Sequence, residues 1–158
     1  MECVAITLLE AAVTNHLVRK RILLVDDEAA VRLTLPRVLG KYGFEVTSVA
    51  SVDDAIKEIK VQKFDALLSD LNLPQPNEGF TVIRAMRRHQ PRCVNFVIAG
   101  DGSVEKEAKQ KVAGYFTKPV DIHELIQTIM DKLDGIAKAD ARTSTSSDLI
   151  VCQSEAFH

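Results

Sequence analysis

The chain has little of several features that mark particular protein classes. Its 158 residues include only three cysteines, Cys3, Cys93 and Cys152. Their odd number and wide spacing argue against a disulfide framework or a zinc site, and are typical of reduced thiols in a cytosolic protein. We therefore expect a cytoplasmic location. There is also no internal repeat and no glycine-rich dinucleotide motif, because Gly100 and Gly102 stand alone without the rest of that fingerprint.

A strong excess of one charge and a long hydrophobic run are missing as well. The net charge of −2 gives no overall attraction to nucleic acid or to an anionic membrane, so neither is expected as a direct partner. The apolar stretch at residues 3–13 contains Glu10, follows no basic residue and is too short to span a bilayer. We interpret residues 1–19 as an N-terminal extension with helical character, rather than as a signal peptide or an anchor.

What is present is an ordinary globular composition, 46% hydrophobic and 27% charged, in a chain long enough for one domain. Apolar runs typical of buried strands alternate with segments of helical periodicity. Strands are expected at 21–25, 44–49, 64–69, 94–98 and 114–117, and helices at 29–41, 51–62, 80–89, 103–111 and 121–133. This alternation predicts an α/β fold, a doubly wound five-stranded parallel sheet with helices on both faces.

The ends of the chain differ in character from this alternating region. We expect one domain at residues 20–137, with no room for an output domain beside it. Residues 138–158 are mostly small and polar, a composition that predicts a disordered tail.

Acidic residues stand where several expected strands end. Asp26 and Asp27 follow the first strand, Asp70 follows the third, Ala99 the fourth and Lys118 the fifth. In an open parallel sheet these ends meet at one edge, where such folds place their sites. Clustered carboxylates repel each other and so hold a cation or a proton, and oxygen ligands of this kind favour Mg²⁺. The alternative, solvated acids with Lys118 in a structural ion pair, is less economical for residues that arrive from three strand ends.

The chemistry that such a cluster favours is transfer of a phosphoryl group to Asp70. A metal and the Lys118 ammonium would neutralise the charge on the phosphoryl oxygens while the carboxylate attacks. A Mg²⁺-dependent phosphohydrolase with Asp70 as nucleophile is a competing interpretation. It would need a second carboxylate two residues further on as acid and base, and Asn72 cannot serve in that role.

Four pieces of this sequence resemble one family in their order and spacing. They are ILLVDDE at 22–28, SDLNLP at 69–74, Gly79, and GYFTKP at 114–119. Over residues 21–133 the chain resembles the receiver domain of two-component response regulators. The resemblance implies the flavodoxin-like strand order 2-1-3-4-5.

The resemblance also implies roles for individual residues. Asp70 would accept a phosphoryl group from a sensor histidine kinase or a phosphotransfer protein, and Lys118 would contact that group. Asp26, Asp27, Asp70 and the backbone carbonyl of Asn72 would hold Mg²⁺. The protein would then be a phosphoacceptor that takes part in its own phosphotransfer and slow hydrolysis, not an enzyme. It would act through a downstream protein that the sequence does not identify.

The sequence departs from the family where the fourth strand ends. The family has threonine or serine there, whose hydroxyl binds the phosphoryl group, whereas this chain has Ala99. Tyr115 matches the aromatic residue that moves inward on activation, and its alternative role is a half-exposed strand residue. The interval from Ala99 to Lys118 is also short for the family. A second function is therefore kept open, a receiver that binds its partner independently of phosphorylation.

Overall fold

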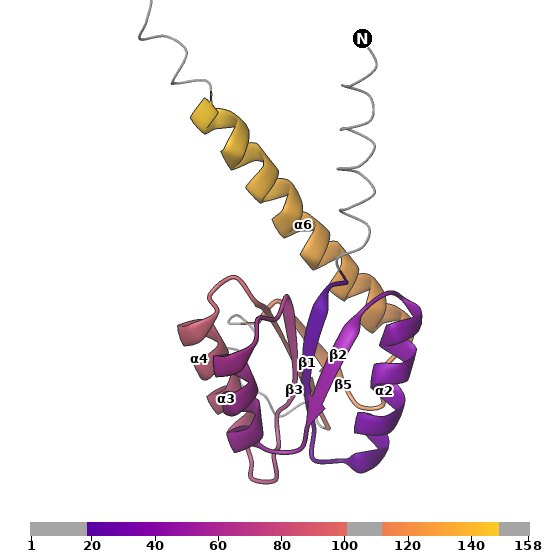
Figure 1. Ribbon diagram of the computed structural model, residues 1–158. Helices are drawn as coiled ribbons and strands as arrows, with labels where there is room; N and C mark the ends of the chain where they lie inside the picture. Colours follow the sequence, from indigo (N-terminus) through magenta and orange to yellow (C-terminus); the bar gives the residue numbers. More distant parts are fainter. Residues whose placement is uncertain (1–18, 101–111, 149–158) are drawn as a thin grey trace, which may run out of the picture. The chain divides into compact units, whose positions relative to one another are not determined.

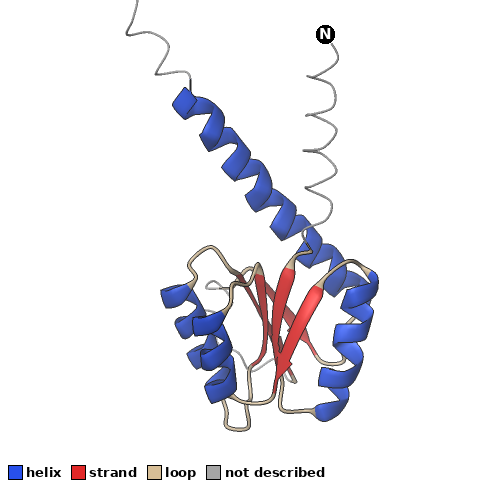
Figure 2. Cartoon of the chain, viewed as in Figure 1, coloured by secondary structure: helices blue, strands red, loops and turns tan. Residues whose placement is uncertain are grey.

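The fold is built on a five-stranded parallel sheet. The computed structural model describes residues 19–100 and 112–148, and it divides into two units at 1–118 and 119–158. The first unit holds the sheet (Figures 1 and 2), with strands β1 (Arg21–Val25), β2 (Glu45–Val49), β3 (Ala66–Asp70), β4 (Val94–Ala99) and β5 (Gly114–Thr117). The strand order is β2-β1-β3-β4-β5 and every neighbouring pair is parallel. The predicted doubly wound sheet and its 2-1-3-4-5 order are confirmed.

Helices cover both faces of this sheet. Helix α2 (Ala29–Lys41) lies on one face, and α3 (Val52–Val61) and α4 (Glu78–His89) lie together on the other (Figure 1). Strands β1, β3 and β4 are almost wholly buried, which explains why they read as continuous apolar runs. The core facing α3 and α4 joins alternate strand residues to both helices, for example Leu23, Leu67 and Val97 with Ile59 and Met86.

Gln90, at the end of α4, is a buried polar residue that the periodicity of the sequence does not reveal. Its Oε1 accepts a hydrogen bond from the N–H of Phe64 at 2.8 Å. Its Nε2 donates to the carbonyls of Ile59 at 2.8 Å and Gln62 at 2.7 Å. One amide therefore satisfies three backbone groups, and it ties the ends of α3 and α4 to the segment that leads into β3.

The second unit corrects one prediction. Helix α6 spans Ile122–Asp148, so the expectation of a helix ending near Leu133 and a disordered tail from residue 138 is wrong for residues 138–148. Alanines at 137, 139 and 141 favour helix, and no proline or glycine follows Gly135 to stop it. The Oδ1 of Asp121 accepts hydrogen bonds from two backbone N–H groups of its first turn, at 2.8 and 3.2 Å, as expected for a cap.

Three expected segments lie outside the described residues. They are the N-terminal extension, apart from its last residue, the helix at 103–111 and the last part of the tail. Within the described ranges, no helix combines the length and the apolar character that crossing a membrane requires.

The thiol of Cys93 should make the stability of the fold depend on pH in the alkaline range. Burial, with a smaller contribution from the charge of Asp65, raises the pKa of this thiol from 9.0 to about 12. The folded protein therefore keeps a proton that the unfolded chain loses, so stability is full below pH 9 and falls as the pH rises toward 12. We expect the free energy of unfolding to drop by about 1.4 kcal/mol per pH unit in this window through Cys93 alone.

Urea unfolding at pH 8.5, 9.5 and 10.5 under reducing conditions measures this effect. The control is Cys93→Ala, which loses this contribution while every other titrating group stays. The two proteins should converge in stability as the pH rises, and parallel pH profiles would show that the thiol ionises normally in the fold.

Candidate functional site

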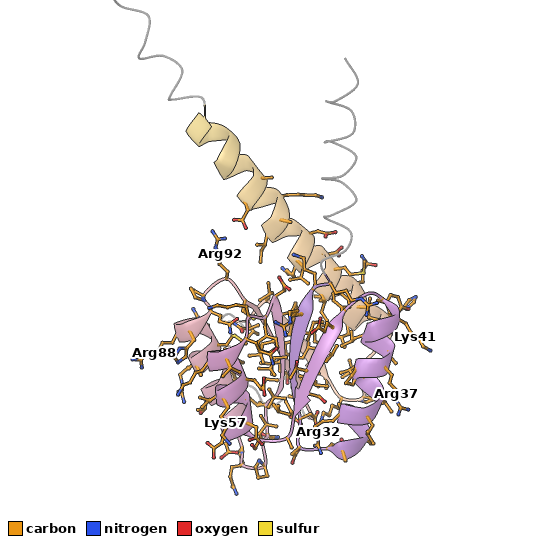
Figure 3. The ribbon with its side chains drawn as sticks, viewed as in Figure 1. Arg32, Arg37, Lys41, Lys57, Arg88 and Arg92 are labelled. Carbon is orange, nitrogen blue, oxygen red and sulfur yellow. The ribbon has the colours of Figure 1, made fainter. Side chains whose placement is uncertain are left out.

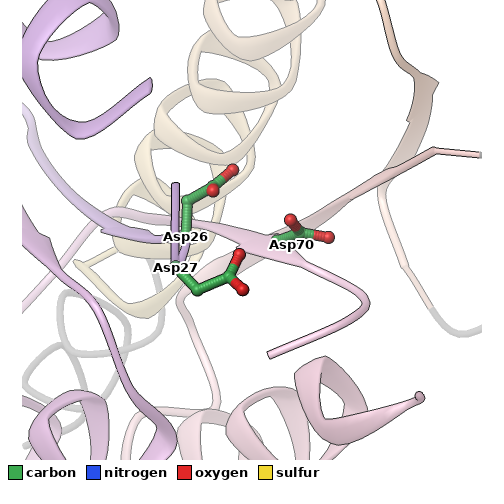
Figure 4. Close-up of side chains that lie close together, drawn as sticks. All are labelled: Asp26, Asp27 and Asp70. Carbon is green, nitrogen blue, oxygen red and sulfur yellow. The ribbon is translucent and has the colours of Figure 1, made fainter. Parts of the chain in front are cut away.

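Three carboxylates meet at the carboxyl edge of the sheet. Asp26 and Asp27 follow β1, and Asp70 is the last residue of β3 (Figure 4). One oxygen from each carboxylate lies within 4.8 Å of the other two. Asp26 and Asp70 are buried whereas Asp27 is exposed. The convergence expected from the topology is thus present for all three acids.

Lys118 brings a positive charge to the same place from the end of β5. Its Nζ lies 2.8 Å from Oδ2 of Asp70 and 3.3 Å from Oδ2 of Asp26. A longer ion pair of 3.9 Å reaches Oε2 of Glu28. Partial burial alone would lower the pKa of Lys118, but the hydrogen bond to Asp70 and the charge of Asp26 outweigh it, so the pKa is raised. The lysine is therefore firmly cationic at neutral pH.

The positive charge of Lys118 does not balance the negative charges of the carboxylates around it. Burial raises the pKa of Asp26, although the N–H of Glu28, 2.8 Å from its Oδ1, and the charge of Lys118 both act in the opposite direction. The nearby charge of Asp70 adds to the rise. A site with this excess of negative charge and only oxygen ligands fits a hard divalent cation such as Mg²⁺. Asp26, Asp27 and Asp70 are the side chains that would hold it.

Arg32 positions the loop that carries two of these acids. Its Nη1 donates hydrogen bonds to the backbone carbonyls of Asp26 at 2.9 Å and Asp27 at 2.7 Å. Sequence reasoning missed this residue. A usable signal exists, because helical side chains lean toward the N-terminus and Arg32 stands in the first turns of α2, directly after the loop.

Backbone contacts fix the segment that follows Asp70. The N–H of Leu71 donates to the carbonyl of Ile98 at 2.9 Å, and the N–H of Gly79 donates to the carbonyl of Leu71 at 2.9 Å. The N–H of Asn72 donates to Oδ1 of Asp70 at 3.1 Å, while the Asn72 side chain is exposed. Asn72 therefore belongs to the site, and the role of its carbonyl as a metal ligand stays a prediction.

Of the two expected switch residues, Ala99 lies at the same edge of the sheet, and Tyr115 lies on the neighbouring strand β5. Ala99 is fully buried at the end of β4, where its carbonyl accepts a hydrogen bond from the N–H of Lys118 at 2.8 Å. Tyr115 pairs with Val97 across the β4–β5 ladder and is partly buried against the core that faces α3 and α4. Their position is compatible with the expected roles, and any movement of Tyr115 stays a prediction.

A parallel sheet in this order, with two adjacent acids, a buried aspartate and a lysine at its carboxyl edge, defines the receiver class of signalling domains. The sequence profile of the response regulator receiver domain matches residues 22–130. The chain belongs to this family, which operates in two-component signalling.

Individual relatives agree with this assignment. The chain is 29% identical over 112 residues to the cell cycle transcriptional regulator CtrA of Caulobacter vibrioides, covering 69% of this chain and 48% of CtrA. It is 29% identical over 118 residues to the response regulator protein PilR of Pseudomonas aeruginosa, covering 73% of this chain and 26% of PilR. The chain therefore spans about half or less of these curated relatives.

Solved structures of receivers are similar over most of their length. A CheY-like receiver domain protein from Methanospirillum hungatei JF-1 superposes with a TM-score of 0.71 at 27% identity, covering 77% of this chain and 99% of that one. A receiver protein from Sinorhizobium medicae WSM419 gives a TM-score of 0.68 at 30% identity, covering 75% and 97%.

Proposed function

We propose that Asp70 accepts a phosphoryl group from the phosphohistidine of a sensor histidine kinase or phosphotransfer protein. The observation that carries this is the 2.8 Å contact between Lys118 and Asp70 inside a group of three carboxylates. An Asp70 oxygen forms the new bond to phosphorus, the bond from phosphorus to the donor imidazole nitrogen breaks, and the imidazole regains a proton.

The other residues of the site support this step electrostatically. When bound, Mg²⁺ would neutralise charge on the phosphoryl oxygens, and Asp26 and Asp27 would hold it beside Asp70. Lys118, within reach of Asp70 and Asp26, would shift onto the incoming group as a point charge. The chain is then a phosphoacceptor and not an enzyme with a separate substrate, and it acts in the cytoplasm through a protein partner.

Ala99 favours a second candidate, a receiver that binds its partner whether or not it is phosphorylated. Its methyl group is buried at the end of β4 and offers no hydrogen bond to a phosphoryl oxygen. A hydrogen bond to a charged acceptor is worth about 1.5–3 kcal/mol, comparable to a whole allosteric coupling energy. Phosphorylation without a large conformational response is the behaviour that this residue predicts.

Acetyl phosphate with Mg²⁺ separates the two candidates. We expect wild type to gain one acid-labile phosphoryl group, and Asp70→Asn to gain none. Asp53→Asn, at an exposed position of α3, is the matched control and should label like wild type. An unlabelled wild type, or label that persists in Asp70→Asn, would overturn the phosphoacceptor proposal.

Hydrogen exchange before and after labelling tests the consequence of Ala99. A small response in wild type that grows in Ala99→Ser would support the phosphorylation-independent candidate for the natural chain. A full response in wild type, unchanged in Ala99→Ser, would remove it.

A further inference from the structure

An arginine-rich surface lies at the end of α4 that is farthest from Asp70. Residues 84–92 contain four arginines, Arg84, Arg87, Arg88 and Arg92, and no acidic residue. All four are exposed, and we call them the arginine surface. In Figure 3, Arg88 and Arg92 project outward from the end of α4 and from the turn that follows it.

The distance from the phosphoacceptor site follows from the path of α4. The helix starts beside the end of β3, where the N–H of Gly79 bonds the carbonyl of Leu71, and it then runs away from that edge. At about 1.5 Å per residue, its end lies roughly 15 Å further along. The arginine surface is therefore separate from the site at Asp70.

Helix-dipole stabilisation explains only part of this charge. Basic residues are favourable in the last turn of any helix, and α2 and α3 each have one there, Lys41 and Lys60. Helix α4 has three in its last turn, Arg87, Arg88 and His89. Arg84 comes before that turn, where the dipole effect has faded. The arginine surface thus exceeds what the helix itself favours.

Arg84, Arg87 and Arg88 also lie close together along α4. Arg84 stands three and four residues before Arg87 and Arg88, a spacing at which like charges on a helix repel. Arg84 donates a hydrogen bond to Oγ1 of Thr81 at 3.1 Å. Across the part of the chain that the structure describes, no carboxylate forms an ion pair with Arg87 or Arg88.

We propose that the arginine surface docks an acidic segment of a partner protein. Arginine guanidinium groups bind carboxylates in a planar, bidentate manner that lysine cannot reproduce. Side chains one helical turn apart are spaced by roughly 5–6 Å. Alternate residues of an extended peptide are about 6.6 Å apart on one side, so alternating acids match this spacing.

Charge favours a short acidic peptide over nucleic acid. Nucleic-acid-binding domains are usually strongly basic, with a pI above about 9. This chain has a pI near 6.1 and a net charge of −2. A long polyanion would also approach the acids at the opposite edge, whereas a segment of a few residues would contact only the arginine surface.

Fluorescence anisotropy with a labelled eight-residue peptide of alternating glutamate and serine tests the proposal at low salt. The full chain should bind it, and the double variant Arg87→Gln with Arg88→Gln should bind about tenfold more weakly, as expected for two lost surface ion pairs. The matched control is Arg37→Gln with Lys41→Gln on α2, which removes the same charge at exposed positions of the other face. This control should bind within about twofold of wild type.

Two results would overturn the proposal. One is an equal loss in both double variants, which would mean that net charge alone drives binding. The other is tighter binding of a single-stranded oligonucleotide of equal charge, which would point to nucleic acid instead. Labelling of Asp70 by acetyl phosphate should be the same in all these proteins, so failure here is distinguishable from failure of the phosphoacceptor proposal.

Discussion

Replacing Gly79 with alanine should destabilise the protein by about 3 kcal/mol or more, the range of severe backbone clashes and overpacking. A Cβ at this position would lie 2.1 Å from the carbonyl oxygen of Asp70 and 2.8 Å from the Cα of Leu71. These neighbours are backbone atoms at the end of the central strand, so they cannot rotate away as a flexible side chain would. Either α4 or the end of β3 must move.

Such a movement would directly reach Asp70, the proposed phosphoacceptor. The N–H of Gly79 is hydrogen-bonded to the carbonyl of Leu71 at 2.9 Å, so moving the helix away breaks a buried bond while moving the strand displaces Asp70. Gly79 therefore lets the first turn of α4 approach the end of β3 closely, which helps to fix the position of Asp70. We expect slower labelling of Gly79→Ala by acetyl phosphate at temperatures where it is still folded.

Gly40→Ala is the matched control for this prediction. Gly40 is an exposed residue inside α2, and a Cβ there would meet nothing within 4 Å. Alanine should therefore stabilise the helix by about 0.5–1 kcal/mol. Urea unfolding of both variants measures the contrast, and a Gly79→Ala protein within 1 kcal/mol of wild type would show that the close approach carries little strain.

The arrangement of this fold can be predicted from the sequence because the residue patterns that indicate each strand and helix are local. Strands β1 and β3 are buried on both faces, so each is a short unbroken apolar run that stops at an acid. Once these runs alternate with helical patterns, parallel topology brings Asp26, Asp70 and Lys118 to one edge. The ion pairs of Lys118 with Asp70 at 2.8 Å and with Asp26 at 3.3 Å agree with this expectation.

What the sequence did not reveal depends on long side chains and close backbone contacts. Arg32 reaches the carbonyls of Asp26 and Asp27 from a neighbouring helix, and Gln90 bonds groups that are 26 to 31 residues away. Neither set of hydrogen bonds produces a periodic pattern in the sequence. Gly79 was visible as part of a motif, but the reason for glycine there is the distance to the Asp70 carbonyl, which only the structure gives.

The length of α6 differs from the expectation for another reason, because the composition of the segment after residue 138 was given too much weight. Small polar residues after 138 suggested disorder, yet the helix continues to Asp148. Serine and threonine are weaker helix formers than alanine by only a few tenths of a kcal/mol each, roughly, and do not stop a helix as proline does.

Replacing Asp26 with asparagine should change stability in opposite directions without and with Mg²⁺. In the absence of metal we expect the variant to be more stable than wild type by about 1–2 kcal/mol. Burial raises the pKa of Asp26, so the ionised form that exists at neutral pH costs stability in the fold. Asparagine removes that charge, and its Oδ1 can still accept the 2.8 Å hydrogen bond from the N–H of Glu28.

The lost ion pair does not reverse this expectation. Lys118 keeps its shorter contact, 2.8 Å to Asp70, when the 3.3 Å contact to Asp26 is weakened. Repulsion from Asp70, which lies in the same cluster of ligand oxygens, disappears at the same time.

Magnesium should reverse the order of the two proteins. A ligand that binds only the folded state adds about 1.4 kcal/mol of stability for each tenfold rise in concentration above its Kd. Wild type has all three carboxylates to hold the ion, whereas Asp26→Asn lacks one of the two buried ones, so its gain from Mg²⁺ should be small.

Thermal unfolding in EDTA and across a Mg²⁺ titration measures both effects in one experiment. Asp53→Asn, an exposed aspartate of α3, should follow wild type in stability and in its response to Mg²⁺. If Asp26→Asn kept the full stabilisation by Mg²⁺, the ion would not be held by Asp26. The ion pair with Lys118 stabilises the Asp26 carboxylate in the fold, whereas burial of its charge destabilises it. If the metal-free variant were less stable than wild type, the ion pair would outweigh the cost of burial.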